Sequence, residues 1–185
     1  NNDMIEISDL GEKSFYDYII SKKNKLNDYK SLVKLIIKIQ KIKVKKSYKL
    51  GKFKVKFLKY TLNNLHKESD LFFDWYLKYC LKEKNISKIK RLLRKELNKV
   101  YKKLKFSNNT FVHRDFHVSN IMLKKKTLGL IDSQDAIIGN PLYDIASLID
   151  DVRIRLPNNL QNNLLEFYHK NSQLKKDNIE SLKND

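Results

Sequence analysis

Apolar residues recur at three- and four-residue steps along the first half of the chain, which is the spacing of helices with one buried face. The pattern is clearest over 86–104, where an apolar stripe runs between lysines and arginines. It also predicts helices over 12–23, 29–42 and 66–81, whereas residues 43–59 favour no single element. We expect the helix over 66–81 to bury an aromatic face as part of the core, and not to offer it to sugars. That face consists of Leu71, Phe72, Trp75, Tyr76 and Tyr79.

The pattern changes beyond residue 109, where short apolar runs alternate with polar segments. The runs at 110–112, 121–123 and 127–131 have the length of strands and are too short for helices. Helical spacing returns over 143–154 and 160–168. We therefore expect an α+β fold that is mostly α, in which short β-hairpins surround one polar loop and a polar tail frays at the end.

The composition limits the class of protein. A chain of 185 residues suits one domain, and 41% hydrophobic residues can bury a core. Cys80 is the single cysteine, which excludes an intramolecular disulfide and a cysteine-based zinc site and indicates a reducing compartment. No apolar run approaches the roughly 18 residues of a membrane span, so we expect no membrane partner. Because the chain starts at Asn1 and not at Met, we expect further sequence before it.

Charge adds one alternative. Lys and Arg number 39 against 21 Asp and Glu, so the formal net charge is +18, and a basic helical protein that binds nucleic acid is one interpretation. The basic residues are mostly lysines spread from Lys13 to Lys183, however, and Asn is the other abundant polar residue. An AT-rich genome encodes both types without selection for a polyanion, and runs of charge are usually solvated faces. We therefore expect no specific nucleic-acid partner.

The most informative segment is 111–123, which contains the pattern His-Arg-Asp-x-x-x-x-Asn. Phosphoryl transfer from ATP needs an acceptor hydroxyl aligned with the γ-phosphate and a divalent metal on the phosphate oxygens. Asp115 can hold and deprotonate that hydroxyl, and Asn120 can ligate Mg²⁺ from the same loop. A hairpin then returns Asp132 to the loop as a second metal ligand. Any one of these residues alone is common in turns, but their order between apolar strands indicates a phosphotransferase.

Three neighbours of these residues are assigned supporting or substrate-contacting roles. His113 precedes the predicted base by two positions, and we expect it to pack beneath the loop and to hydrogen-bond the backbone. Arg114 belongs to the same group. For His117 three alternatives stay open: support of the loop, contact with the substrate, or neither.

Three segments together resemble one known family. They are 113–120, the sequence Ile-Asp-Ser-Gln-Asp-Ala at 131–136, and Gly-Asn-Pro-Leu-Tyr-Asp-Ile-Ala-Ser-Leu at 139–148. They are similar to the aminoglycoside phosphotransferase family, which has a protein-kinase-like fold. Within that family they most resemble bacterial cell-wall kinases that phosphorylate the anomeric hydroxyl of N-acetylmuramate and N-acetylglucosamine. The sequence Asp-Leu-Gly at 9–11 and the Trp75 helix extend the resemblance over roughly residues 4–165.

The resemblance implies that only the C-terminal lobe of such a fold is present. Residues 1–11, whose positions 4–7 alternate like a short strand, would form the hinge strand and linker from a missing N-terminal lobe. The backbone of Glu6, Ile7 and Ser8 would contact adenine. The phosphate-covering loop and the ATP-binding lysine would belong to the missing lobe, so we expect this chain alone to be weakly active or inactive.

The remainder divides further in the same comparison. Residues 12–170 would form the helical C-terminal lobe, with a catalytic loop at 113–120 and a metal segment at 131–136, and 171–185 would be a polar tail. Two departures stand out. Ser133 replaces the aromatic that follows the metal aspartate, which removes an apolar anchor, and Asp150 stands where a basic residue is usual.

Two more acidic residues take roles from the resemblance. Asp144 would brace the catalytic loop, although a carboxylate at this helix start could also serve as a simple cap. Asp135 would either touch sugar hydroxyls or cap a turn.

The predicted function is transfer of the ATP γ-phosphate, with Mg²⁺, to the hydroxyl of a small molecule in the cytoplasm. N-acetylmuramate or N-acetylglucosamine is the expected acceptor. An aminoglycoside, choline or homoserine is the alternative acceptor within the family. Two alternatives are not enzymes: a basic protein that binds nucleic acid, and an inactive fragment. The sequence does not predict an oligomeric state.

Overall fold

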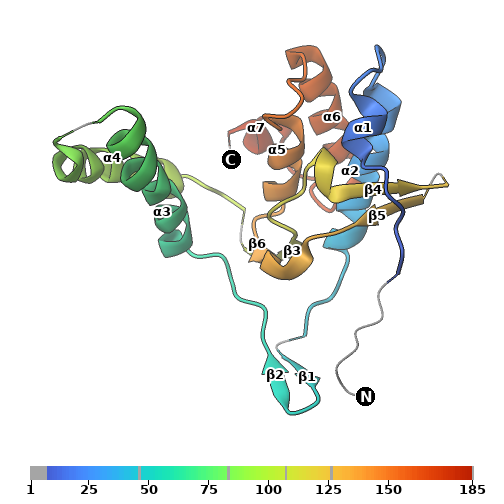
Figure 1. Ribbon diagram of the computed structural model, residues 1–185, viewed down its shortest axis with the longest axis horizontal. Helices are drawn as coiled ribbons and strands as arrows, with labels where there is room; N and C mark the ends of the chain where they lie inside the picture. The colour runs from blue at the N-terminus through green and yellow to red at the C-terminus, as the bar shows by residue number, and fades with distance from the viewer. Residues whose placement is uncertain (1–7, 46, 83, 107, 126, 185) are drawn as a thin grey trace.

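The computed structural model describes residues 8–45, 47–82, 84–106, 108–125 and 127–184 (Figure 1). Within these ranges the chain is mostly helical, and its strands pair as small antiparallel two-stranded sheets, which confirms the α+β prediction. The helices are α1 (Phe15–Ile19), α2 (Leu26–Gln40), α3 (Leu62–Leu71), the π-helix η1 (Phe72–Cys80), α4 (Ile86–Tyr101), α5 (Tyr143–Ile149), α6 (Asn158–Asn171), α7 (Ile179–Lys183) and the 3₁₀ turns η2 (Val118–Asn120) and η3 (Ser133–Asp135). The strands are β1 (Tyr48–Leu50), β2 (Phe53–Val55), β3 (Thr110–Val112), β4 (Ile121–Lys124), β5 (Thr127–Leu130) and β6 (Ile137–Gly139).

The core lies where α2 packs against α6, because each helix turns a strip of large apolar side chains toward the other. Leu32, Val33 and Ile36 of α2 are fully buried, as their spacing predicts, and so are Leu164 and Tyr168 of α6. Residues of α1, α5 and α7 complete the same apolar cluster. This core is the rigid base beneath the polar loop of the predicted site.

Two small sheets hold that loop against the core (Figure 1). β4 and β5 form a hairpin in which Ile121 lies opposite Leu130, and β3 pairs with β6 so that Val112 lies opposite Ile137. The apolar runs predict β3, β4 and β5. They do not predict β6, since its three residues are too few to show a period. A further hairpin, β1 with β2, occupies the stretch 43–59 that the sequence left ambiguous.

The segment 66–81 is helical, but its predicted buried face is wrong. Phe73 and Leu77 are the buried residues of η1, whereas Trp75 is 64% exposed. The other members of the predicted face are also exposed: Leu71, Phe72, Tyr76 and Tyr79. The π-helical turn is wider than an α-turn, as the bond from Leu81 N to Tyr76 O shows, so the side chains rotate away from the positions that a 3.6-residue period predicts.

The apolar stripe over 86–104 forms α4 as predicted, but no residue of α4 is buried. Leu93 and Val100 are exposed because α3, η1 and α4 pack mainly against one another in a helical hairpin. Figure 1 shows this hairpin, in green, projecting from the body of the molecule. α3 and η1 therefore cover one side of α4, and the residues on its other side stay exposed.

Two differences concern the C-terminal part. α5 ends at Ile149 and not at residue 154, and Val152 beyond it is 93% exposed, because the Asp151 carboxylate turns inward to bond the Arg153 backbone N–H. The tail does not fray throughout as predicted. Leu174 and Leu182 are buried against the core, and α7 forms within the tail. In the described part of the chain, no helix combines the length and apolarity needed to cross a bilayer.

The packing predicts a sharp contrast between two leucine substitutions. Leu164→Ala removes a fully buried side chain from the α2–α6 contact, and we expect it to lower the free energy of unfolding by about 2–5 kcal/mol. Leu92→Ala on the projecting hairpin, where the side chain is half exposed, should change it by less than about 0.5 kcal/mol. Urea unfolding followed by circular dichroism measures both, and equal losses would contradict the burial described here.

Candidate active site

The β4–β5 hairpin brings the two predicted metal ligands to one place. Its register ends with Ile121 opposite Leu130, and the next residue, Ile131, donates its N–H to the Asn120 carbonyl over 3.0 Å. Asp132 therefore lies one position beyond the residue that faces Asn120. Its backbone is left-handed, with φ of 66°, which turns the chain sharply into η3 and leaves the side chain exposed. Asn120 itself is buried.

The Asp115 carboxylate is held on both oxygens by its own loop. Asn120 Nδ2 donates to Asp115 Oδ2 over 2.9 Å and to the Asp115 carbonyl over 3.1 Å. His117 Nε2 lies 3.0 Å from Asp115 Oδ1, and His117 is buried. The Asp115 side chain is nevertheless 53% exposed, so it can receive a ligand from the open side. The predicted base and one predicted metal ligand are thus in direct contact, and His117 supports the base.

Asp144 ties the loop to the helical core. It is fully buried in the first turn of α5, and its two oxygens accept the backbone N–H groups of His113 (2.9 Å) and Arg114 (3.1 Å). Burial raises the pKa of Asp144 to about 6, although both N–H bonds act in the opposite direction. Arg114 has a φ of 73°, a conformation that costs free energy in a residue with a side chain, and the Asp144 contact offsets that cost. The carboxylate therefore contacts the loop backbone, as the bracing interpretation requires.

His113 links the loop to the segment that carries Asp132. The ring is fully buried, and its Nε2 lies 3.0 Å from the Ile131 carbonyl, which can only accept, so Nε2 carries the proton. Burial lowers the pKa of His113, although the bond to the Ile131 carbonyl and the charges of Asp115 and Asp132 act in the opposite direction. The buried ring and its bond to a backbone carbonyl have the geometry that the sequence predicts for His113, and its role in the site stays a prediction.

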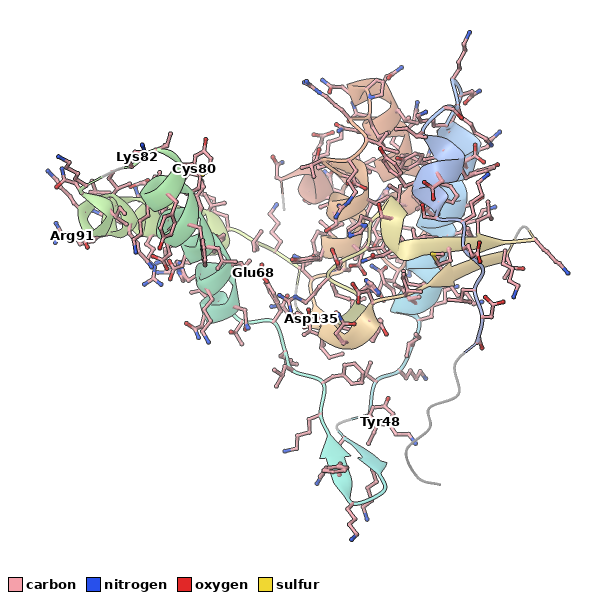
Figure 2. The ribbon with its side chains drawn as sticks, viewed as in Figure 1. Tyr48, Glu68, Cys80, Lys82, Arg91 and Asp135 are labelled. Carbon is pink, nitrogen blue, oxygen red and sulfur yellow. The ribbon has the colours of Figure 1, made fainter. Side chains whose placement is uncertain are left out.

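Arg114 reaches out to two other segments. Its guanidinium pairs with Glu68 of α3 at 2.6 Å, and its Nη1 lies 3.4 Å from the Asp135 carbonyl. Figure 2 shows Glu68 on the side of α3 that faces Asp135 and the body of the molecule. Glu68 is not predicted from the sequence, because nothing in a helical period marks a single charged residue as a partner of a loop more than forty positions away.

Asp151 is a second missed residue. Its carboxylate is buried, and Oδ2 accepts the Val118 N–H over 3.4 Å while Oδ1 accepts from Arg153. It therefore supports the far end of the same loop that Asp144 supports at its beginning. The two acidic residues at 150–151 were the only sign of this contact in the sequence. The sequence does not distinguish Asp150 from Asp151 as a partner of the loop, and in the structure it is Asp151 that bonds the loop.

The site residues fit a magnesium ion that is shared with a phosphate ligand. Because the amide nitrogen of Asn120 donates to Asp115, the amide oxygen can face a metal, and the exposed Asp132 follows the residue that bonds the Asn120 backbone. Among the residues that the structure describes, no three His, Cys, Asp or Glu side chains form a group that could hold a metal. Mg²⁺ is usually bound through one or two such oxygens plus phosphates and water, so a site of this kind needs no larger cluster.

The structure describes only one of the three residues predicted to contact adenine. Glu6 and Ile7 lie outside the described residues, and Ser8 is exposed. Asp135 contributes its carbonyl to Arg114, while its side chain is exposed. Both predictions therefore stay predictions.

Comparison with known proteins adds independent information. The profile of the phosphotransferase enzyme family, APH, matches residues 7–180. The N-acetylmuramate/N-acetylglucosamine kinase of Neisseria meningitidis serogroup B is 32% identical over 95 residues, which is 51% of this chain and 28% of that protein. The protein of the same name from Pseudomonas aeruginosa is 28% identical over 164 residues, which is 84% of this chain and 43% of that protein. The chain thus spans less than half the length of either relative.

The buried Asp144 carboxylate predicts a pH dependence of stability. Its pKa is about 6 in the folded state against 3.8 as the ordinary value, so folding favours the protonated form. This contribution is fully present below pH 4 and is lost as pH rises through 6, and about two pKa units correspond to about 3 kcal/mol.

Asp144→Asn cannot titrate, so its free energy of unfolding should fall by about 2–3 kcal/mol less between pH 4 and pH 7 than that of the wild type. Urea unfolding at a series of pH values measures the difference. Asp177→Asn, at an exposed aspartate, is the control and should keep the wild-type dependence. The same dependence in all three proteins would contradict the assigned burial effect.

Proposed function

Because the chain belongs to the phosphotransferase enzyme family, as its motifs predict, we propose that it carries the catalytic loop of an ATP-dependent kinase acting on a small-molecule hydroxyl. The observation that carries the proposal is the contact between Asp115 and Asn120, with Asp132 beside them across the hairpin. A base and two oxygen ligands for Mg²⁺ then share one edge of the body. That is the set of groups that transfer from MgATP requires.

Asp115 is the proposed base. Each carboxylate oxygen has a further lone pair beyond the bonds from Asn120 and His117, so the open side can accept the hydrogen of an acceptor hydroxyl. As the hydroxyl oxygen forms its bond to the γ-phosphorus, the bond from that phosphorus to the bridging oxygen of ADP breaks, and the hydroxyl proton passes to Asp115. The two loop donors keep the carboxylate in one orientation, which is the main contribution that a protein makes to this reaction.

Asn120 and Asp132 are the proposed ligands of Mg²⁺, which neutralises the phosphate oxygens when it is bound with ATP. The main-chain bond between Ile131 and Asn120 fixes the spacing of the two ligands, and His113 fixes the same segment from below. Asp144 and Asp151 hold both ends of the loop by its backbone N–H groups. In the proposal, Ile131, His113, Asp144 and Asp151 therefore position the loop and its metal ligands.

The lobe assignment is part of the same proposal. The relatives are more than twice as long as the regions that match this chain, so the rest of such an enzyme has room for a second lobe above the nucleotide. Residues 12–170 would form the C-terminal lobe, which holds the base and the metal ligands. The loop that covers the phosphates and the lysine that positions them would come from the other lobe. The proposed adenine contacts, Glu6, Ile7 and Ser8, belong to this chain.

An amino sugar is the proposed acceptor, specifically N-acetylmuramate or N-acetylglucosamine. The support is that two relatives are named as kinases of these sugars and that one of them matches 84% of this chain.

The base is tested by Asp115→Asn in the full-length protein that contains this chain. The substitution keeps the size of the side chain and removes the proton acceptor, so single-turnover transfer from MgATP should fall by about 10²–10⁴-fold. Asp177→Asn, at an exposed residue that bonds no part of the loop among the residues that the structure describes, should keep wild-type rates. Near-wild-type transfer by Asp115→Asn would remove this residue from the mechanism.

The acceptor is tested with a panel of N-acetylmuramate, N-acetylglucosamine, aminoglycosides, choline and homoserine, each assayed with MgATP and the same protein. We expect kcat/KM to be at least about 10²-fold higher for one of the two acetylated sugars than for the other classes, because a site built to bond particular hydroxyl and amide groups rejects ligands that lack them. Turnover of aminoglycosides alone would replace the acceptor and leave the phosphotransferase mechanism in place.

A further inference from the structure

A charged residue of the projecting hairpin formed by α3, η1 and α4 contacts the catalytic loop. No residue of α3 is buried, and the three helices pack mainly against one another. Glu68 on α3 instead bonds residues outside the hairpin. Its Oε1 accepts a hydrogen bond from Arg114 at 2.6 Å, and its Oε2 accepts one from the Tyr60 hydroxyl. Tyr60 belongs to the body, since its N–H donates to the Ile138 carbonyl of β6 over 2.8 Å. Glu68 therefore contacts two residues of the body at once.

An ion pair at Arg114 can influence the orientation of the proposed base. It directly precedes Asp115, and its φ of 73° is uncommon for a residue other than glycine. Its backbone N–H is fixed by Asp144, and its guanidinium lies between Glu68, the Asp135 carbonyl and the Tyr60 ring, 5.9 Å from the ring centroid. A residue in a costly conformation persists only when its surroundings determine it from several sides. Glu68 is the ion-pair partner of the Arg114 guanidinium among the residues that the structure describes.

We propose that Glu68 is a positioning residue, which acts through Arg114 to fix the direction of the Asp115 carboxylate and so couples the helical hairpin to the catalytic loop. The proposal rests on the proposed function, because it assigns Asp115 as the base. Glu68 touches neither substrate nor nucleotide in this account. Its removal leaves Arg114 half-buried without its ion pair, and the guanidinium then moves toward water and pulls the loop with it.

The hairpin offers a matched control. Asp70 lies two residues from Glu68 on the same helix, and its ion pairs are with Lys90 and Arg94 of α4. Those pairs stay inside the hairpin and reach no residue of the loop. A substitution of Asp70 therefore disturbs the hairpin to a comparable degree without disturbing Arg114.

The kinetic test uses the full-length protein with Glu68→Gln, Glu68→Ala, Arg114→Ala, the double variant Glu68→Ala/Arg114→Ala, and Asp70→Asn. We expect kcat to fall about 10-fold in Glu68→Gln and up to about 100-fold in Glu68→Ala, with KM for MgATP within about twofold, because displacement of a base by about 1 Å has effects of this size. The double variant should be no slower than Arg114→Ala, since Glu68 acts only through Arg114. Asp70→Asn should keep kcat within about twofold.

A second measurement does not depend on activity. In the 185-residue chain, hydrogen exchange followed by NMR should be at least about 10-fold faster for the Arg114 amide in Glu68→Ala than in the wild type, while α2 and α6 amides keep their protection. Unchanged exchange, equal loss of kcat in Asp70→Asn, or losses that multiply in the double variant would each overturn the proposal. If the wild-type protein transfers no phosphate, the proposed function fails, and the exchange result alone decides whether Glu68 holds the loop.

Discussion

The geometry of the site depends on one buried carboxylate. The loop between β3 and β4 turns through a left-handed residue, and its N–H groups at His113 and Arg114 find no partner in a helix or a strand ladder. Buried main-chain groups of this kind need an acceptor, and Asp144 supplies one oxygen to each. Because Asp144 stands in the first turn of α5, whose apolar residues belong to the core, the loop takes its position from the core directly.

The proposed chemistry depends on which side chains of this arrangement are buried and which are exposed. His113, His117, Asn120 and Asp144 are all buried, whereas the Asp115 side chain is about half exposed. Groups that are fixed by burial hold a group that faces solvent, which is the arrangement that a reaction controlled by alignment requires. The β4–β5 hairpin adds the third group, since its register places Asp132 one residue beyond the partner of Asn120.

The helical hairpin shows how far a periodic pattern can be used. The period of 86–104 correctly predicts α4, yet a period reveals only which residues share a face and not whether another part of the molecule covers that face. For 66–81 the face itself was wrong, because the π-helical turns of η1 change the angle between successive residues. Glu68, the residue that links this hairpin to the loop, contributes nothing to an apolar period.

The sequence by itself determined most helices of the core, most strands of the two small sheets and the family, because those depend on local spacing and on a motif that is contiguous from His113 to Asn120. The short helix α7 is the exception in the core. It also placed Asp132 at hairpin distance from the loop. Tertiary structure alone decided that Asp151 turns inward and that Glu68 pairs with Arg114. The physical reason is that each of these contacts joins residues more than thirty positions apart, and their meeting is set by how the helices pack and not by the residues themselves.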